Sequence, residues 1–289
     1  MTLGISNQSK AVLLILLTLF CFSLMDSAAK SLTQQVGLAP TLWARYAGQT
    51  LLVLLLVSRR HGVWKATYPK LQIARSVLLL SATAFFFSAL ARMDLAAATA
   101  VMNVNPVLIT LGGGLLLREG LGPRRIMGVL VSLGGALLII QPGSDVFQPA
   151  MVLPLLGAIC YSAYALVTRF VGHDEDVWTS LLYTGIFGGL ITSVVLPFYW
   201  VPPDGTSILL MVGIAAAGTM GQISLIRAFS LAEAASIAPF SYSSLIYAMI
   251  WSILFFGVYP DQMTVLGALV ISASGIYVWH RETRTRNRT

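Results

Sequence analysis

The chain has 289 residues, of which 57% are hydrophobic and only 10% are charged. A soluble domain carries about 25% charged residues, so a water-soluble enzyme or binding domain is excluded and most of the surface must face lipid. Basic loops at a membrane surface account for the net charge of +7, without a nucleic-acid partner.

Apolar runs long enough to cross a membrane follow one another along the whole chain. A span needs about 20 apolar residues, so the sequence predicts an all-α integral membrane protein. The ten predicted transmembrane helices are 11–32, 40–58, 71–91, 96–117, 124–141, 148–170, 178–199, 205–228, 234–257 and 261–280. The first run resembles a signal peptide, but its pattern recurs at 148–170, so we interpret it as a span.

The second half of the chain repeats the first. Cys21-Phe22-Ser23 is echoed by Cys160-Tyr161-Ser162, at 160 − 21 = 139, and the alanine-rich stretch 96–100 is echoed by 234–238, at 234 − 96 = 138. Such internal repeats in a hydrophobic chain are typical of transporters built from two related halves. The predicted five-helix repeats are residues 1–145 and residues 146–289, the second with a basic tail.

The distribution of Lys and Arg predicts the orientation. With the N-terminus inside, 15 of the 18 lie in inner segments, and only Lys30, Arg45 and Arg92 lie toward the outside. Positive residues stay cytoplasmic, so both termini are predicted inside. Because each half has an odd number of spans, the halves enter the membrane in opposite directions. Proteins with such inverted repeats bind substrate near the midplane, between the halves.

Polar residues interrupt two predicted spans that correspond in the repeat. Asn103 and Asn105 precede Pro106 in the fourth span, and Ser241-Tyr242-Ser243 follows Pro239 in the ninth. Proline frees a backbone carbonyl one turn back, which lipid cannot satisfy. These polar side chains are therefore candidates for binding substrate in a central cavity. The alternative is that they only form hydrogen bonds between neighbouring helices.

A second candidate group is charged. Asp26 and Lys30 are four residues apart and can pair on one helical face, and Arg45 enters from the same outer side on the next span. One interpretation is a structural ion cluster that joins the first two helices. The other is an outer gate or a proton-coupling carboxylate, because ionisable residues inside a membrane are often functional.

Aromatic and small residues add further candidates. Phe86, Tyr161 and Tyr164 lie near mid-membrane and could line the cavity or belong to the core. Small residues at a four-residue period favour close helix contact, either between the halves or in a homodimer. The small-residue stripes are Gly128, Ser132 and Ala136, and Gly185 with Gly189.

Motifs of enzymatic chemistry are missing from the sequence. We find no phosphate-binding loop, no G-x-G-x-x-G, no metal-ligand spacing and no Ser/His/Asp set that could meet in one place. The sequence therefore predicts no catalytic residue, no metal site and no cofactor. Its expected partners are a small-molecule substrate and membrane lipid.

Taken in order, several segments resemble the EamA-type branch of the drug/metabolite transporter superfamily. The segments that carry the resemblance are 21–30, Trp43-Ala44-Arg45-Tyr46, Leu115-Leu116-Leu117-Arg118-Glu119, 239–247 and Phe255-Phe256-Gly257. The resemblance covers the whole chain, but Val258 stands where the family often has Glu.

The resemblance implies a secondary transporter in the bacterial inner membrane that works by alternating access. The branch includes riboflavin and S-adenosylmethionine importers and exporters of amino acids and drugs. Amides, hydroxyls and aromatic faces favour a riboflavin-like solute. S-adenosylmethionine-like, amino-acid or drug transport, in either direction, is the alternative, and a membrane-embedded enzyme is the alternative class.

Overall fold

The computed structural model describes residues 7–57, 66–116, 123–143, 149–171, 175–231 and 238–286. These residues form helices joined by short turns, without a strand. Arg118 and Glu119, which carry part of the family resemblance, lie outside the described residues, as do the predicted inner cations Arg59, Arg60, Lys65 and Arg288.

Within the described residues, the predicted spans overlap helices, several of them with a 3₁₀ segment or an interruption, and residues 234–237 of the ninth predicted span lie outside the described residues. The helices of the first half are α1 (Asn7–Val36), α2 (Leu38–Val57), α3 (Pro69–Leu90), α4 (Leu95–Met102), α5 (Asn105–Leu116) and α6 (Pro123–Ile140). Those of the second half are η1 (Pro149–Val152), α7 (Leu153–Val171), α8 (Val177–Val195), η2 (Leu196–Phe198), α9 (Gly205–Leu231), η3 (Ala238–Tyr242), α11 (Ser243–Phe256) and α12 (Gln262–Arg286).

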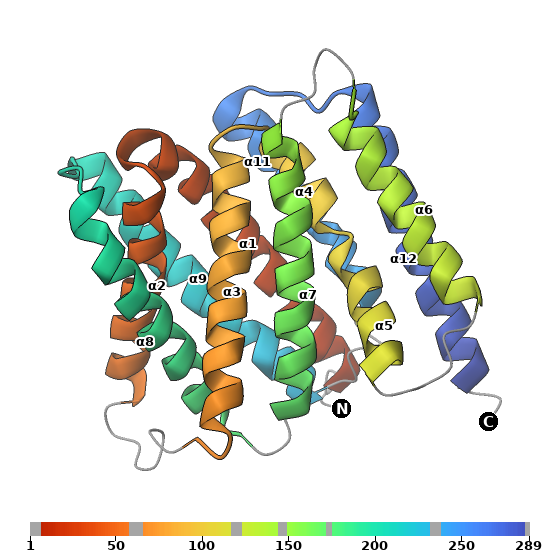
Figure 1. The fold of residues 1–289 in the computed structure, drawn as a ribbon, viewed down its shortest axis with the longest axis horizontal. Helices are drawn as coiled ribbons and strands as arrows, with labels where there is room; N and C mark the ends of the chain where they lie inside the picture. The colour runs from red at the N-terminus through yellow and green to blue at the C-terminus, as the bar shows by residue number, and fades with distance from the viewer. Residues whose placement is uncertain are drawn as a thin grey trace, which may run out of the picture.

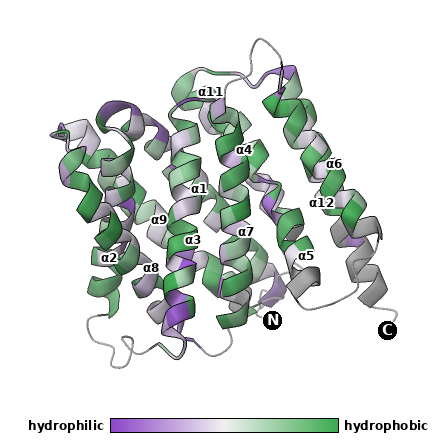
Figure 2. Cartoon of the chain, in the orientation of Figure 1, coloured by the Kyte–Doolittle hydropathy of each residue, from purple (hydrophilic) through white to green (hydrophobic). Residues whose placement is uncertain are grey.

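Six helices are long and apolar enough to cross a membrane. They are Asn7–Val36, Pro69–Leu90, Leu95–Gly113, Pro149–Thr168, Val177–Phe198 and Gly205–Ala228. The shorter apolar helices are Ile126–Ile140, Phe240–Phe256 and Gln262–Tyr277. Figure 2 shows hydrophobic colour along most helices, with polar colour gathered near helix ends such as the lower end of α3. Leu55, Leu209 and Val194 are among many exposed apolar side chains, as expected of a surface that faces lipid.

The helices pack in a reciprocal pattern. By the shift of 138–139 residues, α7, α8 and α9 correspond to α1, α2 and α3, and α12 corresponds to α6. Helix α1 packs on α9 while α3 packs on α7, and α2 and α6 each pack on their own counterpart. Figure 1 shows α3 beside α7 at the centre and α6 along α12 at one edge. This exchange of neighbours is what a two-fold relation between the halves requires.

The small-residue stripes make close contacts inside one chain. A Cβ atom at Gly267 would lie 2.6 Å from the carbonyl oxygen of Gly135, and Ser274 Oγ donates to the Gly128 carbonyl at 2.7 Å. On the other side of the molecule, Gly185 faces Thr50 of α2. Both stripes thus join helices of one chain, and a homodimer stays a prediction that these contacts do not test.

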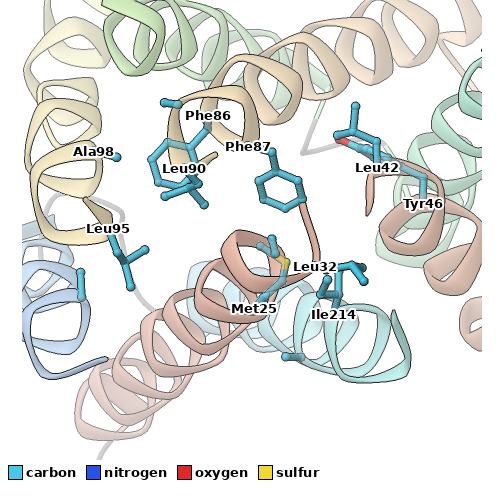
Figure 3. Close-up of a cluster of buried hydrophobic side chains, with 14 of the residues drawn as sticks. Met25, Leu32, Leu42, Tyr46, Phe86, Phe87, Leu90, Leu95, Ala98 and Ile214 are labelled. Carbon is cyan, nitrogen blue, oxygen red and sulfur yellow. The ribbon is translucent and has the colours of Figure 1, made fainter. Parts of the chain in front are cut away.

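The largest apolar core lies between α1, α2, α3, α4 and α9. Figure 3 shows Met25 and Leu32 of α1 facing Phe87 of α3, with Tyr46 of α2 and Leu95 of α4 at the two sides. Phe86, predicted as a cavity residue, belongs to this cluster and is 7% exposed. The core fixes α1, α2 and α3 together, and so positions the polar residues that they carry.

Candidate substrate site

The interruption of the fourth predicted span lies between α4 and α5, at Asn103. The Asn103 side chain donates to the Thr99 carbonyl at 2.7 Å and to Ser244 Oγ at 3.0 Å. An amide nitrogen has two hydrogens, so both donors of Asn103 are used within the protein. The contacts of Asn103 therefore agree with the second interpretation, in which it forms hydrogen bonds between neighbouring helices.

The other polar residues at the two interruptions differ in their surroundings. Tyr242 is buried against α12, where a Cβ atom at Gly275 would overlap its hydroxyl oxygen. Ser243 Oγ donates to the Phe240 carbonyl at 2.6 Å, whereas Ser241 is half-buried. Asn105 is also half-buried, and its carbonyl accepts from Ser162 of α7. Of the predicted polar residues at the two interruptions, Asn105 and Ser241 have partly accessible side chains that form no hydrogen bond in the described chain.

Lys30 does not pair with Asp26, contrary to the sequence prediction. Its Nζ donates to the carbonyls of Leu90 at 3.0 Å and Met93 at 2.6 Å, and lies 5.4 Å from the centre of the Phe256 ring. Unsatisfied carbonyls at a helix C-terminus attract cations, and this end of α3 lies closer to Lys30 than the carboxylate does. Lys30 therefore ties α1 to the end of α3.

Arg45 is the cation that interacts with Asp26 electrostatically. The Arg45 side chain is 7% exposed, and its Nε is buried with no hydrogen-bond partner. The guanidinium lies over the rings of Tyr46 and Phe87, at 5.5 and 5.7 Å from their centres. No ion pair or hydrogen bond of Asp26 or Arg45 occurs in the described part of the chain. A buried charge with unused donors is therefore present beside a half-buried carboxylate.

Two tyrosines of α7 connect this pair to a second arginine. The Tyr161 and Tyr164 rings lie 5.6 Å apart, and Tyr161 interacts electrostatically with Arg45. The Tyr164 hydroxyl accepts from Arg75 Nη2 at 3.2 Å, and the Arg75 guanidinium lies 5.2 Å from the Tyr164 ring. Tyr164 is thus held in place by α3, whereas the half-buried Tyr161 has no hydrogen bond in the described chain.

Arg75 lies in the interior, although the distribution of Lys and Arg predicts it among the inner cations. Arg75 is 2% exposed and also donates to Gln72 Oε1 at 2.9 Å and to Thr168 Oγ1 at 2.8 Å. The available signal was its place four residues inside the predicted span 71–91, where charged residues are rare. Arg75 thus joins α3 to α7 through its hydrogen bonds to Tyr164 and Thr168.

Among the described residues, no group of three or more His, Cys, Asp or Glu is placed to hold a metal ion. The candidate site residues include the Asp26 carboxylate, the Arg45 and Arg75 guanidiniums, the Tyr161 and Tyr164 hydroxyls and the Asn105 amide, on α1, α2, α3, α5 and α7. Side chains of these types can bind a solute through hydrogen bonds and ring faces.

A model of the EamA-like transporter family matches two segments of the chain, residues 9–141 and 148–279. This chain belongs to the EamA-like transporter family. The match covers nearly all of the helices described above, and it makes the chain a multi-pass membrane transporter of the drug/metabolite type.

Several characterised transporters are similar to this chain over most of its length. The riboflavin transporter of Rhizobium johnstonii is 29% identical, over 92% of this chain and 90% of its own. The pseudopaline exporter of Pseudomonas aeruginosa is 27% identical, over 90% and 92%. The S-adenosylmethionine uptake transporter of Rickettsia prowazekii is 22% identical, over 93% and 92%. These relatives move different small molecules, and in different directions.

One crystal structure supports the fold over the whole chain. Its protein is 17% identical and superposes with a TM-score of 0.70, over 97% of this chain and 99% of its own. The helical arrangement of this family is therefore shared by proteins of widely different sequence.

Proposed function

We propose that the protein is a secondary transporter that takes up a riboflavin-like solute across the bacterial inner membrane by alternating access. The observation that carries the proposal is that Asp26, Arg45 and Tyr161, from helices of both halves, make no side-chain hydrogen bond in the described part of the chain. Arg45 is buried and the other two are half-buried. Buried polar groups are normally hydrogen-bonded, so a set that is not bonded suits a solute.

The proposed architecture is ten spans in two inverted five-helix repeats. The packing of α1 on α9 and of α3 on α7 supports it. Because α7 and α9 are the counterparts of α1 and α3, a two-fold axis in the membrane plane would convert one contact into the other. The first turn of α1 and the last turn of α12 lie at the same end of the bundle (Figure 1), which fits an even number of spans. The excess of Lys and Arg in the predicted inner segments supports a cytoplasmic position for that end.

Cysteine labelling tests this topology. In a variant without Cys21 and Cys160, a cysteine at Gln34 should react with a membrane-impermeant maleimide in intact cells. A cysteine at Thr285 should react only after permeabilisation. Labelling of Thr285 from outside would overturn the proposed orientation.

The ring faces around the site support a flat aromatic solute. The half-buried Tyr161 ring lies 5.6 Å from the Tyr164 ring, and a partly accessible aromatic face can stack on a flat ring system. The name of the relative from Rhizobium johnstonii points to the same class. The site itself contains no residue that we assign to catalysis, so a membrane-embedded enzyme is not proposed.

A cationic solute such as S-adenosylmethionine is the second candidate. It is favoured by one observation, that Asp26 has no ion pair with Lys30, because an unpaired carboxylate attracts a cation. The charge of Arg45 opposes it. Uptake by cells that cannot make riboflavin, and separately by cells that cannot make S-adenosylmethionine, decides between the two. Growth on low external riboflavin is the expected result, and rescue only by S-adenosylmethionine would contradict it.

A further inference from the structure

The first turns of α3 are joined to the second half of the chain by side-chain hydrogen bonds. Gln72 Nε2 donates to Ser180 Oγ of α8 at 3.0 Å. Arg75 donates from Nε to Thr168 Oγ1 at 2.8 Å and from Nη2 to the Tyr164 hydroxyl at 3.2 Å, both on α7. The exposed fractions of Gln72 and Arg75 are 0% and 2%. A buried cation whose described acceptors are all uncharged thus holds one half of the chain against the other.

The repeat relates this contact to a second one between α9 and α1. A Cβ atom at Gly157 of α7 would lie 3.3 Å from the Ala82 carbonyl oxygen of α3. Thr18 Oγ1 of α1 lies 3.3 Å from the Gly221 carbonyl oxygen of α9. These two contacts are equivalent, at 157 − 18 = 139 and 221 − 82 = 139. The start of α3 against α7 therefore corresponds to the start of α9 against α1, and the two helices begin at opposite ends of the bundle (Figure 1).

The side chains at the equivalent positions of α9 and α1 are apolar. Arg75 corresponds to Ile214, at 214 − 75 = 139, and Tyr164 corresponds to Met25, at 164 − 25 = 139. Ile214 is 0% exposed and Met25 is 3% exposed, and both belong to the largest apolar core. The two equivalent contacts between the halves are thus stabilised differently, one by hydrogen bonds of a charged side chain and the other by apolar packing.

Equivalent contacts at opposite ends are the places where a transporter with inverted repeats opens. Alternating access moves one repeat against the other around a central site, so each end opens where the halves separate. Separation of α3 from α7 would expose the Tyr164 and Thr168 hydroxyls to water. While the helices are in contact, these hydroxyls depend on Arg75 as a donor, because a buried polar group without a partner is unfavourable.

We propose that Arg75 is the residue that keeps the inner end of the substrate path closed, by holding α3 against α7. The inference rests on the proposed function, which supplies alternating access and the orientation of this end. It goes beyond that function by assigning the closure to one buried side chain, and by making the inner closure polar and the outer closure apolar.

Cysteine reactivity of the full-length protein tests the inference without a substrate. The reporter is Ala82→Cys in a variant without Cys21 and Cys160. Ala82 is 1% exposed, faces α7, and lies two turns from Arg75 on the same face of α3. Inside-out membrane vesicles present the inner end to a charged methanethiosulfonate that cannot cross the membrane. Adding Arg75→Gln should raise the reaction rate of the reporter about tenfold or more, since hydrogen bonds of a charged group are lost only from the closed state.

Two further variants keep the shape of the contact while each removes one acceptor of Arg75. Tyr164→Phe and Thr168→Val should each raise the rate about threefold or more, and they remain decisive if Arg75→Gln does not fold. The matched control is Arg92→Gln, which makes the same chemical change at an exposed position just beyond the other end of α3. It should leave the rate unchanged.

The side from which the reagent acts separates this inference from the proposed function. An unchanged or lower rate in all three variants would overturn the role of Arg75. An equal rise in right-side-out vesicles would indicate general loosening of the protein and would also overturn it. A rise in right-side-out vesicles alone would overturn the proposed orientation, and with it the inner position of this closure. Failure of riboflavin uptake would overturn the proposed substrate and leave the labelling result standing.

Discussion

Asn103 and Ser244 join the two interrupted helices of the molecule. Asn103 Nδ2 lies 3.0 Å from Ser244 Oγ, and Ser244 Oγ lies 3.1 Å from Asn103 Oδ1 and 2.9 Å from the Ser241 carbonyl. A hydroxyl has one hydrogen, so Ser244 shares it between these two acceptors. At the shift of 138 residues Asn103 corresponds to Ser241, three residues before Ser244, so the contact links corresponding regions of the two halves.

Asn103→Ala should lower stability. It removes the bonds to Ser244 and to the Thr99 carbonyl in a buried place, and a buried polar group left unpaired costs about 1–3 kcal/mol. Thermal unfolding in detergent measures the loss. A double-mutant cycle with Ser244→Ala should give a coupling of at least about 0.5 kcal/mol. Additive losses would mean that the two residues do not interact.

Asn105→Ala should instead lower uptake with little change in melting temperature. The Asn105 side chain is half-buried and makes no hydrogen bond in the described chain, so its removal leaves no protein group unpaired. We expect its loss to weaken solute binding by one hydrogen bond, about 0.5–1.5 kcal/mol. Riboflavin uptake at equal protein level is the measurement. Unchanged uptake would remove Asn105 from the site.

Gly188→Ala should destabilise the contact between α8 and α2. A Cβ atom there would overlap the ring of Tyr46, which is fully buried and whose hydroxyl is bonded to Thr83 and Leu79. Because Tyr46 cannot move aside, we expect a loss of about 1–3 kcal/mol. The matched control is Gly213→Ala, where nothing lies within 4 Å, and it should keep or raise the melting temperature.

Lys30→Met should destabilise the protein independently of Asp26. Lys30 satisfies the Leu90 and Met93 carbonyls, so adding Asp26→Asn should not restore stability. We expect the two losses to add within about 0.5 kcal/mol. Asp26→Asn with Arg45→Gln should be non-additive, since these two side chains interact. If Asp26→Asn did rescue Lys30→Met, the result would support the Asp26–Lys30 ion pair that was predicted from the sequence.

Asp204 gives stability a dependence on pH. Its Oδ1 accepts from the backbone N–H of Ser207 at 2.7 Å at the start of α9, and this bond lowers the pKa of the exposed carboxyl. A lowered pKa contributes stability above the unfolded value, about 3.9 for Asp, and that stability is lost as the pH falls through the folded pKa. The melting-temperature advantage of the wild type over Asp204→Asn should therefore be present at pH 7 and disappear at low pH.

The control for this cap is Asp176→Asn. Asp176 precedes α8 as Asp204 precedes α9, but its side chain makes no cap bond. Its substitution should leave the melting temperature at pH 7 nearly unchanged. An equal effect of the two substitutions would show that general surface charge, and not the cap, is responsible.

The sequence by itself determined the helical membrane class, the positions of the helices and the repeat. These follow from local properties, because a lipid environment forces every apolar run of sufficient length into a helix. Even the interruption at Asn103 was predictable, because Pro106 lacks a backbone donor. The candidate site was found only in part. Asp26, Arg45 and Tyr161 were among the predicted residues, and their role in binding solute stays a prediction.

The partners of those residues were decided by the tertiary structure alone. Helical spacing allowed Lys30 to reach Asp26, but the free carbonyls at the end of α3 lie closer, although they are 60 residues away in sequence. The sequence predicted Arg75 as an inner surface charge. In the structure α7 lies beside α3, and Tyr164 and Thr168 accept hydrogen bonds from Arg75. Spacing along one helix specifies which side chains share a face. Which acceptor a buried charged side chain bonds to depends on how the helices pack, because an acceptor on any neighbouring helix can lie closer than one on the same helix.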